Sequence, residues 1–145
     1  NGLGVGLDLL PAIIFLVAAF IGFAMGTSWG TIALILPIII GVFDAADPLF
    51  LVAVGSALAG AVYGDHISPI SDTTILSSAG AKCNHLRHVA TQIPYATLVM
   101  IVCFVGYVIA GFTKSPWISL ALGVVLIVIA VLVLVRMEAS KKAKA

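Results

Sequence analysis

Charged residues are scarce in this chain, which excludes most classes of soluble protein. Only 9% of its 145 residues are charged, while 62% are hydrophobic. This composition lies outside the range of soluble globular domains and is typical of proteins that lie in a lipid bilayer. Because a spanning helix needs about 20 mostly apolar residues, the length suits roughly four or five membrane segments and no soluble domain. We therefore expect an all-α membrane protein, a polytopic helical bundle.

Basic residues are absent from the first half of the chain, where none precedes Lys82. The sequence thus lacks the basic face interleaved with aromatic residues that binds nucleic acid, and no nucleic acid partner is expected. Cysteine is equally rare, because Cys83 and Cys103 are the only two and give no disulfide framework. The C-x-H-x-x-H spacing of Cys83, His85 and His88 matches no common zinc pattern, so we interpret this stretch as a polar loop.

The start of the chain lacks the features of a signal peptide. Asn1 is followed by neither a basic region nor a small-residue cleavage site. We expect residues 1–145 to be the C-terminal transmembrane transport domain of a longer protein, whose missing N-terminal half completes any site. No internal repeat is found in the sequence.

Two apolar runs flank a polar segment in the first third of the chain. Residues 9–25 are slightly short for a full crossing and lead into Gly26–Thr31, after which residues 32–43 are again apolar. The pattern predicts either two tilted crossings or a re-entrant hairpin, residues 9–43, whose tip lies at mid-depth. We favour the hairpin. Its tip offers the hydroxyls of Thr27, Ser28 and Thr31.

The sequence pattern of residues 48–81 predicts one helix with a break. The first part is apolar and rich in small residues, which favours close helix contacts. Polar residues then fill 64–74, where Gly64 and Pro69 are expected to interrupt the helix. Asp72 is expected to cap the second piece. Because this piece is too short to cross the hydrocarbon alone, the break is expected near mid-membrane.

Two ordinary spans are expected at residues 94–112 and 117–137. The basic tail at 138–145 marks the cytoplasmic side, because lysine and arginine are enriched in cytoplasmic loops. Alternation of the spans then puts the connection between them outside, together with the acidic turn at 44–47. The same alternation puts the loop at 82–92 inside.

The polar segment at the predicted break carries the chemistry. A charge at the bilayer centre costs at least about 2.5–3.5 kcal/mol, so two aspartates are expected there only if they bind an ion. Na+ prefers oxygen ligands, and unwound backbone adds free carbonyl groups. The candidate ion-binding and proton-coupling residues, with both carboxylates as Na+ ligands, are Asp65, Asp72, His66, Ser68, Ser71, Thr73 and Thr74.

The two carboxylates are predicted to differ in their preference for a proton. Asp65 lies at the negative C-terminal end of one half-helix, and Asp72 lies at the positive N-terminal end of the other. Asp65 is therefore our candidate for the group that accepts either Na+ or H+. An ordinary helix cap explains Asp72 equally well. A histidine beside a helix end, such as His66, is more often a hydrogen-bonding partner than a ligand.

Two segments carry a resemblance to a known family. Gly-Thr-Ser-Trp-Gly-Thr at 26–31 and the stretch from Gly64 to Ser78 resemble the signature of the NhaC-type Na+/H+ antiporter family, and the likeness extends over most of 22–95. The resemblance implies a transporter of the bacterial inner (plasma) membrane, within the ion transporter superfamily. In that superfamily each of two inverted halves pairs a re-entrant hairpin with a broken helix, and this chain corresponds to the second half.

The resemblance also implies what accompanies the chain. No cofactor is expected beside the transported Na+ and H+. The expected partners are the lipid bilayer, the missing N-terminal half and a second copy in a homodimer.

The function stays open between two kinds of transporter. Na+/H+ exchange is the first interpretation, and a Na+- or H+-coupled exchanger of small organic acids or amino acids, of the malate/lactate type, is the alternative. An anion would need backbone N–H groups, hydroxyls or the missing half, because no lysine or arginine lies at the break. An intramembrane protease is a further class. It needs two carboxylates from separate helices or an H-E-x-x-H motif, which is absent, so no enzyme is expected.

Overall fold

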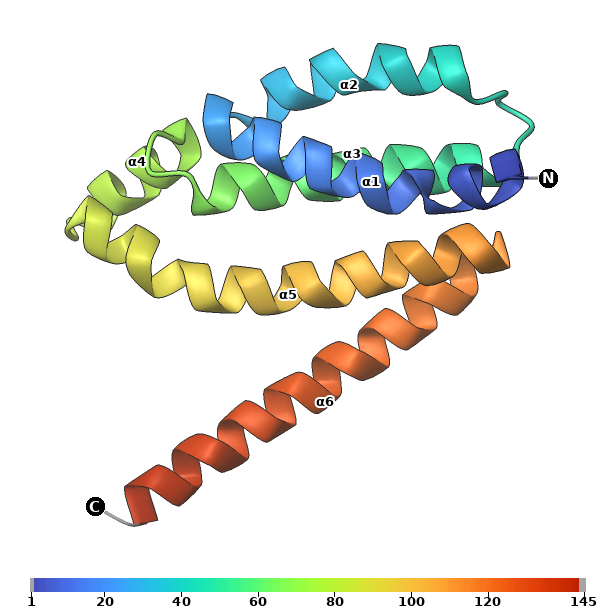
Figure 1. Ribbon diagram of the computed structural model, residues 1–145. Helices are drawn as coiled ribbons and strands as arrows, with labels where there is room; N and C mark the ends of the chain where they lie inside the picture. Colours follow the sequence, from blue (N-terminus) through green and yellow to red (C-terminus); the bar gives the residue numbers. More distant parts are fainter. Residues whose placement is uncertain (1, 144–145) are drawn as a thin grey trace.

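The computed structural model describes residues 2–143, with side chains from 6 to 136, and this part of the chain is helical with no strand (Figure 1). The prediction of an all-α membrane protein is confirmed, because four of the helices, α1, α3, α5 and α6, are long and apolar enough to cross a membrane. In chain order the helices are α1 Gly2–Met25, α2 Ser28–Val42, α3 Pro48–Ile67, α4 Asp72–Gly80, α5 His85–Thr113 and α6 Pro116–Ala143.

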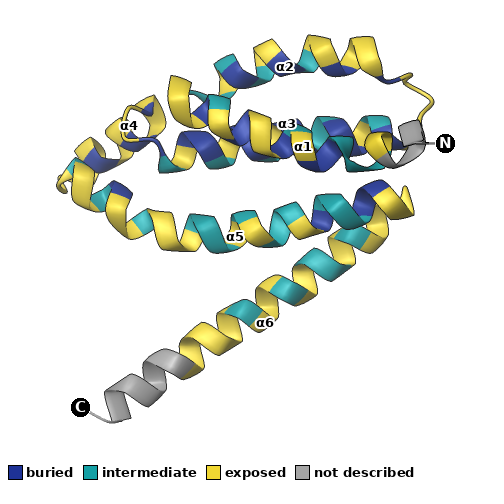
Figure 2. Ribbon diagram, in the orientation of Figure 1, coloured by how far each residue is buried: buried dark blue, intermediate teal, exposed yellow. Residues whose placement is uncertain are grey.

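Helices α1, α2 and α3 enclose the core. The first and third run side by side in the same direction, and α2 returns antiparallel to them (Figure 1). Small residues bring α1 and α3 into backbone contact, since a Cβ on Gly60 would overlap the Phe15 carbonyl oxygen. Buried residues concentrate on these helices, whereas α6 is largely exposed (Figure 2). The apolar core residues are Ala18, Ile35, Ile39, Phe43, Leu49, Ala53 and Ala57.

The turn between α1 and α2 is shorter than the predicted tip. It contains only Gly26 and Thr27, because Ser28 to Thr31 form the first turn of α2. Helix α1 also begins before Leu9, so it has the length of a full crossing rather than of a short arm. The re-entrant depth of this hairpin stays a prediction.

The predicted break lies in the expected region but is narrower. Helix α3 continues through Gly64 to Ile67, because Gly64 serves close packing against α1 and not helix termination. The expectation that Asp72 caps the next helix is wrong. Ser71 is the N-cap, with its Oγ accepting the Thr74 N–H at 3.2 Å, and Asp72 is the first helical residue.

The length of α3 bears on the depth of this break. At about 1.5 Å per residue α3 rises about 30 Å, and α3 with α4 exceeds one hydrocarbon thickness. A break near mid-membrane therefore requires α3 to begin outside the hydrocarbon, and this depth stays a prediction.

The last two helices are longer than expected. The predicted loop at 82–92 is reduced to residues 81–84, because Asn84 Oδ1 accepts the Arg87 N–H at 3.0 Å and starts α5 at His85. Pro94 lies inside α5 and does not begin it. Helix α6 continues into the predicted tail as far as Ala143, and residues 144–145 of that tail lie outside the described residues.

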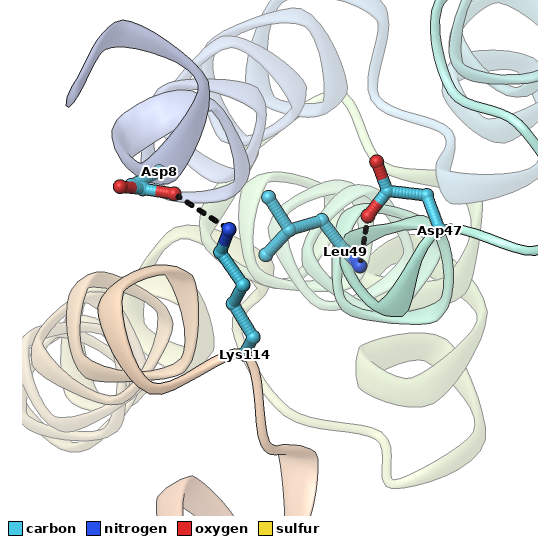
Figure 3. A network of polar contacts seen from close by, with 4 residues as sticks. All are labelled: Asp8, Asp47, Leu49 and Lys114. Carbon is cyan, nitrogen blue, oxygen red and sulfur yellow. Dashed lines mark hydrogen bonds and ion pairs between the residues drawn. The ribbon is translucent and has the colours of Figure 1, made fainter. Parts of the chain in front are cut away.

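The turns between the helices lie at two opposite ends of the bundle. The α1–α2 turn, α4 and the start of α5 lie at one end, and the turns at 43–47 and 114–115 lie at the other (Figure 1). This arrangement agrees with the predicted alternation, while the cytoplasmic assignment of either end stays a prediction. At the second end Lys114 Nζ lies 3.9 Å from Asp8 Oδ1, and Asp47 Oδ1 accepts the Leu49 N–H at 2.8 Å (Figure 3).

Candidate functional site

The break between α3 and α4 comprises Ser68–Ser71, which the sequence forces out of the helix. Pro69 has no N–H to donate and restricts Ser68 to extended backbone, as its ψ of 128° shows. The Ser68 N–H bonds the Asp65 carbonyl oxygen at 3.1 Å, and the Ser71 N–H bonds the Ser68 carbonyl oxygen at 3.3 Å. The unwound backbone thus stays close to the last turn of α3.

Asp65 occupies that last turn with its carboxylate turned inward. Only 4% of the residue is exposed. Its Oδ2 accepts a long hydrogen bond of 3.4 Å from the Thr73 hydroxyl, while its buried Oδ1 has no hydrogen-bond partner among the described residues. An unpartnered buried carboxylate oxygen is costly, and among the described residues of the break this atom is the one buried side-chain group that lacks a partner a ligand could supply.

Two further hydroxyls extend from Asp65 to the start of α4. Thr73 Oγ1 lies 2.8 Å from Ser71 Oγ. Because Thr73 uses its single hydroxyl hydrogen on Asp65, Ser71 donates to Thr73 and accepts the Thr74 N–H. The structure therefore brings together three predicted site residues, and Thr74 joins them through its backbone.

The break is also anchored to α1. The Ser68 hydroxyl donates to the Phe23 carbonyl oxygen at 2.8 Å, near the end of α1. Gly26 follows at a positive φ of 66°, and a Cβ there would lie 2.8 Å from the Ile70 carbonyl oxygen. Only glycine meets both demands without strain. Ser68, predicted as an ion ligand, has its hydroxyl engaged in this contact.

His85 joins the break from the other side, a contact that sequence reasoning missed. Its Nε2 lies 2.7 Å from the Pro69 carbonyl oxygen, and its Nδ1 lies 3.1 Å from Ser78 Oγ of α4. The sequence grouped His85 with Cys83 and His88 as neighbours in a loop. No local signal identifies Pro69 as the partner, because it lies 16 positions earlier in the chain.

Two other predicted residues lie apart from this cluster. Asp72 is exposed, and its Oδ1 accepts the Thr73 N–H at 2.7 Å. His66 follows Asp65 by one position and therefore projects roughly 100° around the helix from it. It is exposed and lines a cavity of about 580 Å³ between α3 and α5, together with Tyr63 and Cys103.

The predicted hairpin-tip hydroxyls do not join Asp65 among the described residues. Thr31 is fully buried, and its hydroxyl donates to the Thr27 carbonyl oxygen at 2.9 Å at the start of α2. Thr27 is the N-cap of α2 but makes no side-chain capping bond. In the described part of the chain, no hydrogen bond links Thr27, Ser28 or Thr31 to Asp65. Their role in ion binding stays a prediction.

Known proteins resemble a large part of this chain. Residues 5–112 match the model of the Na+/H+ antiporter family. An uncharacterized protein of Haemophilus influenzae is 51% identical over 110 residues, 75% of this chain and 21% of that protein. The malate-2H(+)/Na(+)-lactate antiporter of Bacillus subtilis is 34% identical over 113 residues, 74% of this chain and 24% of its own.

A third relative is an uncharacterized Na(+)/H(+) antiporter of Haemophilus influenzae, 36% identical over 80 residues, 55% of this chain and 17% of that protein. The chain thus spans between 17% and 24% of the length of these three relatives. No solved structure matches it. Because the family match covers most of the chain, the chain belongs to the Na+/H+ antiporter family, whose members are transporters and not enzymes.

Proposed function

We propose that the protein containing this chain exchanges Na+ for H+ across a membrane through the α3–α4 break. The observation that carries the proposal is the buried Asp65 carboxylate, whose Oδ1 has no partner among the described residues. No lysine or arginine precedes Lys82, and Lys82 itself is exposed. A buried carboxylate without a basic partner is stabilised by a proton or by a bound cation, and these are the two proposed cargoes.

The surrounding atoms suit a Na+ ion. The Asp65 carboxylate supplies the charged ligand, and the hydroxyls of Thr73, which bonds its Oδ2, and of Ser71 supply neutral oxygens near it. Carbonyl groups of the unwound segment add further oxygens of the kind that hard cations prefer. Asp72, exposed at the positive end of α4, is proposed as the second carboxylate that attracts cations to this opening.

Competition at one atom couples the two fluxes. Asp65 lies in the last turn of α3, at the negative end of the helix dipole. A carboxylate that holds either Na+ or H+ but not both exchanges the two ions, provided that only the neutralised states change their access to the two sides. Thr73, which is exposed, lies between Asp65 and the surface of the chain and therefore marks the entrance.

The relative of Bacillus subtilis favours a second candidate. Its name describes malate and lactate exchange coupled to H+ and Na+, so an exchanger of small organic acids or amino acids is the alternative for this protein. The N-terminus of α4 offers backbone N–H groups to an anion, but the Asp72 carboxylate beside it opposes one. The charge of the break therefore favours a cation as cargo.

The wider architecture belongs to the same proposal. The chain is proposed as a C-terminal portion of an NhaC-type antiporter in the bacterial inner membrane, with its basic C-terminus in the cytoplasm. The α1–α2 pair is then the re-entrant hairpin, and an inverted N-terminal half covers the exposed side of α4. Lipid surrounds the assembly, and a homodimer is the proposed oligomer.

Proteoliposomes with the full-length protein test the proposal. Asp65→Asn keeps the shape of the side chain but removes the exchanging carboxylate, so Na+-driven proton flux is expected to be lost. Asp44→Asn is the matched control, because Asp44 is exposed in the turn between α2 and α3. Asp72→Asn is expected to weaken Na+ affinity without abolishing exchange. Full Na+-dependent flux in Asp65→Asn contradicts the proposal.

A further inference from the structure

His85 lies outside the proposed ion site but contacts two of the segments that form it, the break and α4. Its two ring nitrogens bridge the Pro69 carbonyl oxygen in the break and the Ser78 hydroxyl of α4. His85 is itself the first residue of α5, so one side chain ties three parts of the chain together. Pro69 has no backbone N–H, so it cannot form a helical hydrogen bond. The shape of the break therefore depends on side-chain contacts such as those of His85.

Hydrogen-bonding chemistry fixes the direction of these contacts. A carbonyl oxygen only accepts, so Nε2 carries a hydrogen and donates to Pro69. Ser78 Oγ lies 2.9 Å from the Ile75 carbonyl oxygen as well as 3.1 Å from Nδ1. A neutral ring accepts from Ser78, whereas a charged ring donates to it and frees the hydroxyl hydrogen for Ile75. Both contacts therefore persist in either protonation state of His85.

We propose that His85 is a positioning residue that holds the Ser68–Ser71 break in the shape that binds the transported cation, a role that rests on the proposed function. Pro69 lies two positions before Ser71, which bonds Thr73, and Thr73 in turn bonds Asp65. Ser68, the residue before Pro69, binds the break to α1. With His85 removed, the break loses its side-chain tie to α4 and α5, and the Ser71 and Thr73 hydroxyls lose their fixed distance from Asp65.

Two readouts on the full-length protein test this role. Hydrogen–deuterium exchange measures the opening of the break, and the apparent KM for Na+ measures the quality of the site. Losing a hydrogen bond of ordinary strength changes an equilibrium by about tenfold, so His85→Ala is expected to speed exchange in residues 68–75 and to raise the KM by about that factor. The maximal rate is expected to change far less than the KM.

Two further variants separate positioning from general damage. His85→Gln retains an N–H donor for the Pro69 carbonyl and is expected to restore most of the KM. His88→Ala is the control, because His88 lies one turn along α5 and the described residues give its side chain no hydrogen bond. It is expected to leave exchange at 68–75 and the KM unchanged.

The outcomes distinguish this inference from the proposed function. Equal deuterium uptake at 68–75 in the wild type and His85→Ala overturns the inference whatever the substrate is. Faster uptake with an unchanged KM overturns it too, since His85 then has a merely structural role. A wild-type protein without Na+-dependent proton flux instead contradicts the proposed function. Faster uptake together with a raised KM, both reversed in His85→Gln, supports the inference.

Discussion

Gly64 of α3 packs so closely on Ala19 of α1 that a Cβ on Gly64 would overlap the Ala19 carbonyl oxygen. The same Cβ would lie 2.6 Å from the Phe23 backbone nitrogen. Both neighbours are backbone atoms of α1, so a side chain at position 64 would fit only if α1 or α3 moved. Asp65 is the next residue, and it is buried beside this contact between α1 and α3.

Substituting Gly64 by alanine is therefore expected to separate α1 from α3. Overpacking of this kind costs about 1–3 kcal/mol, so Gly64→Ala is expected to lower the thermal unfolding midpoint of the purified full-length protein. Tryptophan fluorescence during heating measures it. Gly41→Ala is the control, because Gly41 lies in α2 with no atom within 4 Å of its added Cβ. Equal midpoints for the two variants contradict the tight α1–α3 contact.

Thr73 offers a test of the oxygen ligands around Asp65. Thr73→Val keeps the shape of the side chain but removes the hydroxyl between Asp65 and Ser71. We expect the apparent KM for Na+ to rise by about tenfold, as for the loss of one polar contact. Thr73→Ser keeps the hydroxyl and is expected to stay near the wild type. A KM that is unchanged in Thr73→Val removes Thr73 from the site.

Lys114 provides a test of backbone strain at the other end of the bundle. It adopts a left-handed conformation with φ of 51° after the last turn of α5, where glycine is the preferred residue. Lys114→Gly and Lys114→Ala both remove the contact with Asp8, so their difference isolates the backbone. We expect Lys114→Gly to be the more stable by about 1 kcal/mol in thermal unfolding. Equal stability, or a more stable alanine variant, contradicts the left-handed backbone conformation at position 114.

Composition and hydropathy were sufficient to predict the helical membrane fold and the region of the break. Both depend on local properties, namely apolar runs and the inability of Pro69 to continue a helix. Apolar sequence precedes Asp65, and the residue is buried in the fold, while its role in ion binding stays a prediction.

The helix boundaries and some hydrogen-bond partners could not be predicted from the sequence, for physical reasons. Gly64 looked like a helix end, but its lack of a side chain serves packing against α1, which is a non-local contact. Ser71 and Asp72 are both good N-caps, so local chemistry does not choose between them. The bond from His85 to Pro69 joins two turns that only the fold brings together. Sequence reasoning therefore located the break but not the contacts that hold it.

Infrared difference spectroscopy on the full-length protein tests the central claim most directly, because a protonated carboxyl group has its own carbonyl stretching band. If Na+ and H+ compete for Asp65, adding Na+ at mildly acidic pH removes one such band from the wild-type spectrum, and Asp65→Asn lacks this change. An unaltered band on Na+ addition, or the same loss in Asp65→Asn, would contradict the account.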